Sequence, residues 1–277
     1  ERVLDTLGKT VHGAEMNELT VHIADQNSLY SACGQGATAC YFPSSETMVV
    51  SGSPTNPNNQ MPQGMVISHE YAHHIEANRS VPGWNASDLG ARHWATYEHV
   101  CEGVGAGTMF PGDQGAHYWD NPGEAFAQAY ATMLYPDAVP WWWHFGKPDQ
   151  GALDAIRADV ADAGRGPTVR WSRSLAPGAS SAAMTITTSL DGPIDVTLQQ
   201  PRSARFDLTL RSADGRLLSR GRVKRSSRAA VSRLSYSSCG ARTFTLQVRR
   251  RAGKGKFRAK IRGRVGVTAV RGRASSR

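Results

Sequence analysis

The chain has 277 residues, of which 40% are hydrophobic, and a formal net charge of +9. This length predicts two domains, and a membrane-spanning helix is not expected because no stretch approaches 18 uninterrupted apolar residues. The net charge conceals a division of the chain. Residues 1–164 carry 6 Lys and Arg against 19 Asp and Glu, a balance of −13, whereas residues 165–277 carry 26 against 4, a balance of +22. We therefore expect a domain boundary near residue 165.

The first part of the chain mixes helical and strand patterns. Alternating apolar and polar residues over 18–23 predict a half-buried strand, and two further short strands are expected at 38–41 and 47–51. Helices are expected at 1–12, 61–78, 121–134 and 149–163, with loops at 52–60 and Trp141–Trp143 and irregular, Gly-rich chain over 79–120. The three tryptophans are expected to pack against neighbouring helices, with a place in a substrate cleft as the alternative. This mixture predicts an α+β domain over residues 1–166.

After Gly166 the apolar period changes to two. Segments such as Met184–Ile186, Leu208–Leu210 and Phe244–Val248 alternate cleanly, and Asp214-Gly215 marks a hairpin turn. About six or seven such strands predict an all-β antiparallel sandwich over residues 175–277.

The four cysteines indicate disulfides more than a metal site. Cys33, Cys40, Cys101 and Cys239 form no C-x-x-C pair, which argues against a cysteine zinc site. Cys33 and Cys40 flank a short Gly-rich loop that a disulfide could close, which would leave Cys101 with Cys239; four free buried thiols in a cytosolic protein are the alternative. Because the chain begins at Glu1 without a signal-peptide pattern, we expect a secreted product whose signal peptide, and any propeptide, is not part of this sequence.

The strongest functional pattern is His69-Glu70-Tyr71-Ala72-His73, an H-E-x-x-H segment. Residues four apart on a helix share one face, so His69 and His73 can point to one metal ion. Glu70 lies about 100° further round the helix, a position that suits a general base better than a ligand. The alternative is a surface helix with two unconnected histidines.

A catalytic zinc ion usually takes three protein ligands. Glu124, on the helix that begins at Asn121-Pro122, is the expected third ligand, with Gln128 one turn later supporting the ligands. The alternative for Glu124 is a capping box with Asn121. His74 points away from His73 and is expected to support the ligands or the fold. Rival third ligands are Glu98, Asp88, Asp113, Asp120 and His117.

Two segments, HEYAHHIE at 69–76 and NPGEAFAQ at 121–128, resemble zinc metallopeptidases of the gluzincin type. They are similar to secreted bacterial enzymes and, more distantly, to the catalytic domain of anthrax lethal factor. The resemblance implies a zincin-like fold with His69, His73 and Glu124 on one catalytic zinc ion and Glu70 as base. It also implies an assisting Tyr shortly before the third ligand, for which Tyr118 is the candidate and the adjacent His117 the alternative. Gln128 stands where relatives often have Glu.

We therefore expect a secreted, monomeric zinc endopeptidase that cleaves proteins or peptides, with the strand at 47–51 as a sheet edge that holds the substrate. Two alternatives are a non-catalytic binding or adhesion protein with a structural or decayed zinc site, and a hydrolase of another amide such as a cell-wall crosslink.

The second domain resembles pre-peptidase C-terminal sandwiches. Its charge, densest at Arg249–Arg251 and Lys254–Arg264, could bind an anionic cell-surface polymer or could be only a solvated face. Specific nucleic-acid binding is not expected, because aromatic residues are sparse there.

Overall fold

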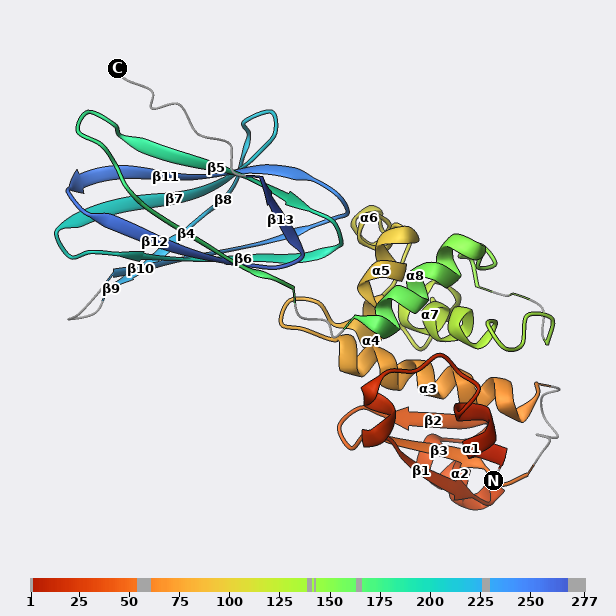
Figure 1. Cartoon of the computed structure of the whole chain (residues 1–277). Coiled ribbons are helices and arrows are strands. Elements are labelled where there is room, and N and C mark those ends of the chain that lie inside the picture. Colours follow the sequence, from red (N-terminus) through yellow and green to blue (C-terminus); the bar gives the residue numbers. More distant parts are fainter. Residues whose placement is uncertain are drawn as a thin grey trace. The chain divides into compact units, whose positions relative to one another are not determined.

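The computed structural model describes residues 2–53, 61–138, 141, 143–162, 166–225 and 230–268. The chain divides into two compact units, Glu1–Gly164 and Arg165–Arg277 (Figure 1). The first unit combines helices with a small sheet and the second is built of antiparallel strands. The α+β character of the first part and the sandwich in the second are thereby confirmed at this level.

The first unit has a three-stranded sheet in the order β1-β3-β2. Strand β3 pairs in parallel with β1 and antiparallel with β2. The elements up to the end of the sheet are α1 (Arg2–Leu7), the 3-10 helix η1 (Ala14–Glu18), β1 (Thr20–Ala24), α2 (Gln26–Cys33), β2 (Ala39–Phe42) and β3 (Thr47–Ser51). All three expected strands form, whereas α2, which is capped by the side chain of Asp25, was not expected.

The expectation that the strand at 47–51 is a sheet edge is wrong. Strand β3 is central, and the backbone groups on both its sides pair with β1 and β2. Four of its five residues are buried, as is typical of a strand covered on both faces. A substrate strand therefore cannot add to β3, and the sheet edges are β1 and β2.

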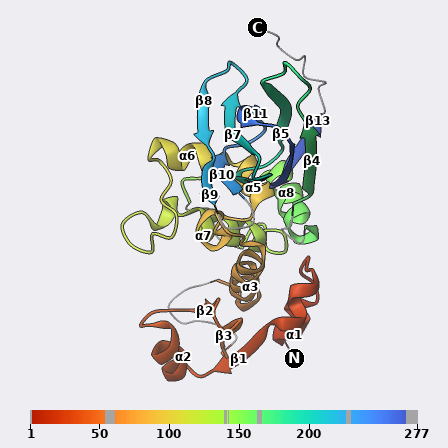
Figure 2. The same cartoon turned by 90° about the vertical axis from the view of Figure 1, so that its left-hand side faces the viewer.

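Helix α3 (Gln63–Arg79) runs between this sheet and the remaining helices of the unit (Figures 1 and 2). Those helices are α4 (Ala86–Leu89), α5 (Arg92–Tyr97), α6 (Val100–Ala106), η2 (Tyr118–Asp120), α7 (Pro122–Ala131) and α8 (Gln150–Ala161). The expected helices at 61–78, 121–134 and 149–163 are confirmed with slightly shorter bounds. The stretch 79–120 contains three short helices that were expected to be irregular chain, because helices of four to seven residues are too short to show a periodic pattern.

Helix α7 packs against α3, and every residue of α7 is buried. Four of its residues are buried alanines, Ala125, Ala127, Ala129 and Ala131, whose small side chains suit a helix that is covered on all sides. At its start Asn121 caps the helix by accepting from the N–H of Gly123 at 3.1 Å, and a Cβ on Gly123 would lie only 2.2 Å from the carbonyl oxygen of Ser87. Only glycine fits at position 123 without displacing α4.

Trp141 and Trp143 belong to the core of this unit, as expected. The Trp141 indole donates to the carbonyl oxygen of Phe145 at 2.6 Å, and Trp143 is buried beside Tyr118 with ring centroids 6.1 Å apart. Trp142 lies outside the described residues.

The second unit is a sandwich of two five-stranded sheets with a single apolar core between them. One sheet has the order β4-β12-β6-β10-β9 and the other β13-β5-β11-β7-β8. The strands are β4 (Thr168–Ser174), β5 (Ser181–Thr188), β6 (Gly192–Gln200), β7 (Ala204–Ser212), β8 (Leu217–Arg220), β9 (Arg222–Arg225), β10 (Ala230–Ser238), β11 (Thr243–Gly253), β12 (Lys256–Arg262) and β13 (Val265–Thr268). Strict alternation of buried and half-buried residues in β5 and β6 shows why the period-two pattern predicted a sandwich.

The cysteines form disulfides, as predicted. Cys33 and Cys40 are bonded, with Cα atoms 5.7 Å apart, and join the end of α2 to β2. None of the described cysteines is a free thiol. None of the helices that the structure describes is long and apolar enough to cross a membrane.

Candidate metal centre

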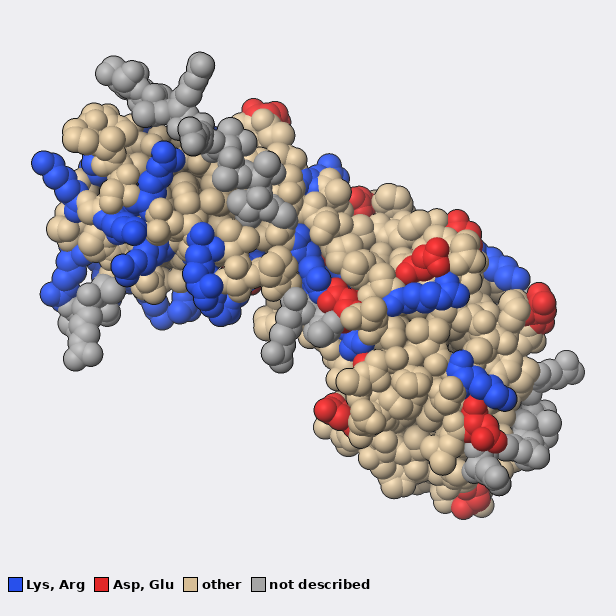
Figure 3. All heavy atoms as spheres, in the orientation of Figure 1, with Lys and Arg blue, Asp and Glu red and all other residues tan. Residues whose placement is uncertain are grey.

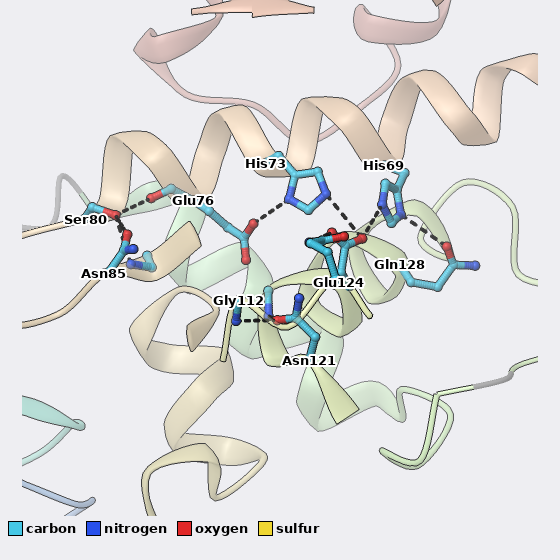
Figure 4. Close-up of polar contacts among 12 residues, drawn as sticks. His69, His73, Glu76, Ser80, Asn85, Gly112, Asn121, Glu124 and Gln128 are labelled. Atoms are coloured by element: carbon cyan, nitrogen blue, oxygen red, sulfur yellow. Dashed lines mark hydrogen bonds and ion pairs between the residues drawn. The ribbon is translucent and has the colours of Figure 1, made fainter. Parts of the chain in front are cut away.

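Helices α3 and α7 bring three predicted ligands together. His69 and His73 project from α3 toward Glu124 on α7 (Figure 4). The Oε2 atom of Glu124 lies 3.2 Å from Nε2 of His69 and 3.6 Å from Nε2 of His73. One ligand atom from each of the three residues lies within 4.8 Å of the others. Spacing of i and i+4 on one helix therefore produces the convergence expected from the sequence.

These contacts match the size of a zinc site. Bonds of about 2.0–2.1 Å in a tetrahedron place neighbouring ligand atoms about 3.3 Å apart, close to the two distances from Glu124. Two imidazoles and one carboxylate are also a ligand set typical of catalytic zinc with an open fourth position. The three residues can therefore hold a metal ion of this kind.

The other ring nitrogen of each histidine is held by a hydrogen-bond acceptor. Nδ1 of His69 lies 3.3 Å from Oε1 of Gln128, and Nδ1 of His73 lies 2.8 Å from Oε2 of Glu76. Because an amide oxygen or an ionised carboxylate accepts here, each Nδ1 donates a proton to its partner, and Nε2 is the atom left to face a metal. In the metal-free site Nε2 can also donate to Glu124, and it must give up that proton when a metal binds. Gln128 thus lies where the sequence predicted it, supporting His69.

Glu124 is held by two further donors. The hydroxyl of Tyr118 donates to Oε2 at 2.9 Å, and the side-chain amide of Gln114 donates to Oε1 at 2.8 Å. Burial would raise the pKa of Glu124, but the charges and hydrogen bonds of His73 and His69 hold it well below its usual range. The carboxylate is therefore ionised, as a metal ligand must be.

The alternative capping role of Glu124 does not occur. The backbone N–H of Asn121 donates to the carbonyl oxygen of Tyr118 at 3.1 Å rather than to Glu124. Asn121 instead accepts from the N–H of Gly112 and donates to the carbonyl oxygen of Asp113. This buried side chain holds the 112–121 loop so that Gln114 and Tyr118 reach Glu124.

Glu70 lies beside the ligands without binding as one of them. It is 8% exposed, and none of the described residues donates a hydrogen bond to its carboxylate. Burial raises the pKa of Glu70, with His69 and His73 opposing the shift and Glu124 adding to it. Its charge also acts on Tyr118, whose pKa is raised mainly by burial and by Glu124.

His74 has a different role from the predicted support of the ligands. Its Nε2 donates to the carbonyl oxygen of Glu15 at 2.8 Å, and its Nδ1 accepts from the hydroxyl of Tyr41 at 2.9 Å. Both nitrogens are therefore occupied in joining α3 to η1 and β2. Fold support was the other role considered for this residue, and the structure gives it that one.

His117 and the rival ligands lie outside the group. The exposed ring of His117 stacks on Phe110, with centroids 3.7 Å apart. Among the described residues, His69, His73 and Glu124 form the one group of three whose ligand atoms converge. The rivals Glu98, Asp88, Asp113 and Asp120 do not belong to it.

Two contacts of the site were missed in the sequence. Glu76 follows His73 by three residues, a spacing that could have indicated their contact. Gln114 had no comparable signal, because it reaches Glu124 only through the fold of a loop.

No protein-family model matches the chain, and a search of curated proteins returns no significant match. The function must therefore be argued from the residues of the site.

Proposed function

We propose that this protein is a secreted zinc-dependent peptidase in which Glu70 acts as general base. The convergence of two imidazole Nε2 atoms and the Glu124 carboxylate, each held from behind by a hydrogen bond, carries this proposal. The Glu70 carboxylate lies beside the ligands and accepts no hydrogen bond from the described residues. A purely structural metal site does not need such a carboxylate, whereas a catalytic site needs a base. The disulfides support export from the cytosol.

His69, His73 and Glu124 would hold the zinc ion. When bound, the ion would supply a positive charge that polarises a substrate carbonyl and makes water a stronger nucleophile at neutral pH. Gln128 and Glu76 orient the two imidazoles and fix their tautomers. Gln114 orients the third ligand.

Glu70 would accept the proton of the attacking water as the new C–O bond forms. It would then pass this proton to the leaving amine as the C–N bond breaks, so the carboxylate ends the cycle in its starting state. Glu70 follows His69 directly in the helix, so it lies next to the ligands. Its side chain points about 100° away from that of His69 around the helix axis.

Tyr118 would assist by donating a hydrogen bond to the oxygen that becomes negative during attack. Its hydroxyl points at Oε2 of Glu124, and its pKa is raised above the ordinary value by burial and by Glu124. It therefore keeps its proton and serves as a donor. His117, exposed and stacked on Phe110, is the weaker candidate for this role.

The test is hydrolysis of an unfolded general protein substrate by the wild type and by Glu70→Gln at equal zinc content. We expect wild-type cleavage and a loss of at least about 100-fold in the variant, the lower end for a general base. Glu18→Gln is the matched control, because Glu18 is exposed at the end of η1. Equal activity of Glu70→Gln and wild type would remove Glu70 as base. Inactivity of a wild type that binds one zinc ion would contradict a broad peptidase.

A further inference from the structure

The outer face of the β4-β12-β6-β10-β9 sheet carries an open hollow with a volume of about 1550 Å³. Residues of β4, β6, β10 and β12 form its floor, and the chain from Leu218 to Lys224 forms one side. The hollow lies entirely within the sandwich unit. Lys and Arg side chains gather over this unit (Figure 3), whose charge balance is +22.

The register of the strands places four of these cations in one row. Arg170 on β4 lies opposite Lys260 on β12, which lies opposite Thr197 on β6. Thr197 lies opposite Arg233 on β10, which lies opposite Arg222 on β9. Because directly opposite residues share one face of a sheet, the row crosses all five strands on the side of the hollow. It spans four strand spacings of about 4.8 Å, or about 19 Å.

Neighbouring rows continue the pattern. Arg258 lies between Ser172 and Gln199, and Lys224 lies opposite Val231. Among the described residues that line the hollow, Asp195 is the one that is acidic. The face therefore combines many cations with uncharged hydroxyl and amide groups.

This arrangement has an electrostatic cost for the folded sandwich. Like charges directly opposite in a sheet are destabilising, and Arg170 faces Lys260 just as Arg233 faces Arg222. In the described parts of the chain no carboxylate forms an ion pair with any of these four side chains. Arg251, on the other sheet, is by contrast paired with Asp207. An anionic ligand on this face would relieve the repulsion that the protein does not relieve itself.

We infer that this face binds a linear acidic polysaccharide, with the row of Arg170, Lys260, Arg233 and Arg222 as its centre. Guanidinium groups match carboxylate and sulfate groups with two parallel hydrogen bonds. Thr197, Gln199 and Ser172 between the cations can pair with sugar hydroxyls. The inference is independent of the peptidase proposal, because it concerns the sandwich alone.

The chemistry of the face disfavours single-stranded nucleic acid. Trp171 is the one aromatic side chain in the described lining of the hollow, and its ring packs edge-on against buried Phe257 with centroids 5.0 Å apart. Bases of a single strand would therefore have no stacking platform. Of the two segments with the densest charge in the sequence, Lys254–Arg264 contains β12 of this sheet, whereas Arg249–Arg251 lie on β11 in the opposite sheet.

The experiment measures binding of the full chain to two soluble polysaccharides, one sulfated and one bearing only carboxylates, and to single-stranded and duplex DNA, at low and high salt. The test variant is Arg170→Gln/Arg233→Gln/Lys260→Gln. The control variant is Arg205→Gln/Arg216→Gln/Arg249→Gln, which removes the same charge from exposed positions outside the hollow. Melting temperatures show whether both variants fold.

We expect the wild type to bind at low salt and to lose affinity steeply as salt increases, by analogy with counterion release from nucleic acids. The test variant should bind at least about tenfold more weakly than the wild type, with a shallower salt dependence. The control variant should lose no more than about threefold in affinity. Stronger binding of the sulfated chain would identify sulfate as the preferred group, and stronger binding of the other would identify carboxylate. Equal losses in both variants, no binding to either polysaccharide at low salt, or tighter binding of a single-stranded or duplex DNA would overturn the inference.

Discussion

The two units of this protein use charge in opposite ways. In the first unit, charged side chains such as Glu15, Arg79 and Glu76 are buried and contact one another or the backbone. In the sandwich, Asp191 is the one charged side chain among the buried polar residues that the structure describes, and a row of cations stands on an outer sheet face. Buried polar groups hold each other in one geometry, which suits a metal centre, whereas exposed cations present a broad field, which suits a flexible polymer. The following predictions test this contrast.

The largest effect is expected for Glu124→Ala, which removes one of three metal ligands. Loss of a residue that only supports a ligand weakens metal binding by up to about 100-fold. Loss of a ligand itself should therefore lower the zinc affinity by more than about 100-fold, and peptidase activity should fall with it. Zinc titration by calorimetry measures the first and substrate hydrolysis the second. Unchanged zinc affinity would exclude Glu124 as a ligand.

Loss of the Glu15 carboxylate should destabilise the first unit strongly. Glu15 accepts from Nη2 of Arg79 at 2.9 Å, from the Tyr71 hydroxyl at 3.0 Å and from the N–H of Gly13 at 2.7 Å. Glu15→Ala leaves a buried guanidinium without its counter-charge, so the free energy of unfolding should fall by about 3–5 kcal/mol. Denaturant unfolding checks this, and exposed Glu18→Ala is the control. Similar losses in both variants would contradict the buried pair.

The same carboxylate gives a pH dependence with a definite sign. Burial would raise the pKa of Glu15, but the Gly13 N–H and Arg79 together hold it below the ordinary value of 4.5. Its stabilising effect is therefore complete above about pH 4.5 and is lost as the pH falls through the lower folded-state pKa. The stability difference between wild type and Glu15→Gln should narrow as the pH falls below 4.5. A constant difference down to pH 2 would contradict this account.

A moderate effect is expected at Gln128, the acceptor for His69. Gln128→Leu removes the hydrogen bond that orients the imidazole and should weaken zinc binding by about 10–100-fold. Gln128→Glu keeps an acceptor at the same place and should bind zinc at least as tightly as wild type. If both variants bind zinc like the wild type, the contact at 3.3 Å has no part in the site.

The smallest effect is expected on the basic face. Lys260 lies opposite Arg170, whereas Lys256 on the same strand lies opposite the uncharged Ser174. Lys260→Gln should therefore raise the free energy of unfolding by about 0.2–1 kcal/mol at low salt, and Lys256→Gln should change it less. The difference should shrink in high salt because salt screens exposed charges. A destabilising Lys260→Gln would mean that the side chain contributes more by packing than it costs by repulsion.

Much of the metal site follows from local spacing. His69 and His73 share a face because they are four residues apart on α3, and Asn121-Pro122 begins α7 as its capping pattern indicated. The contact of Glu76 with His73 was not predicted, although both lie on α3 at a spacing of three residues. Gln114 was not predicted because it reaches Glu124 only through the fold of a loop. For His74 the structure decided between the two expected roles, because its partners come from η1 and β2. The edge-strand prediction for 47–51 was wrong for a similar reason. Strand order in the sequence does not determine which strand lies in the middle of a sheet.

The sequence by itself determined the helical metal-binding pattern, the division into an acidic and a basic unit, and the period-two strands of the second unit, because all three depend on near neighbours or composition. The tertiary structure brought Glu124 to His69, 55 residues away in the sequence, as proposed from the pattern. It alone decided that Gln114 holds Glu124 and that cations from four strands form one row. Loop folding and strand register bring together residues that are far apart in the sequence. No local pattern indicates these contacts, so they are visible only in the folded chain.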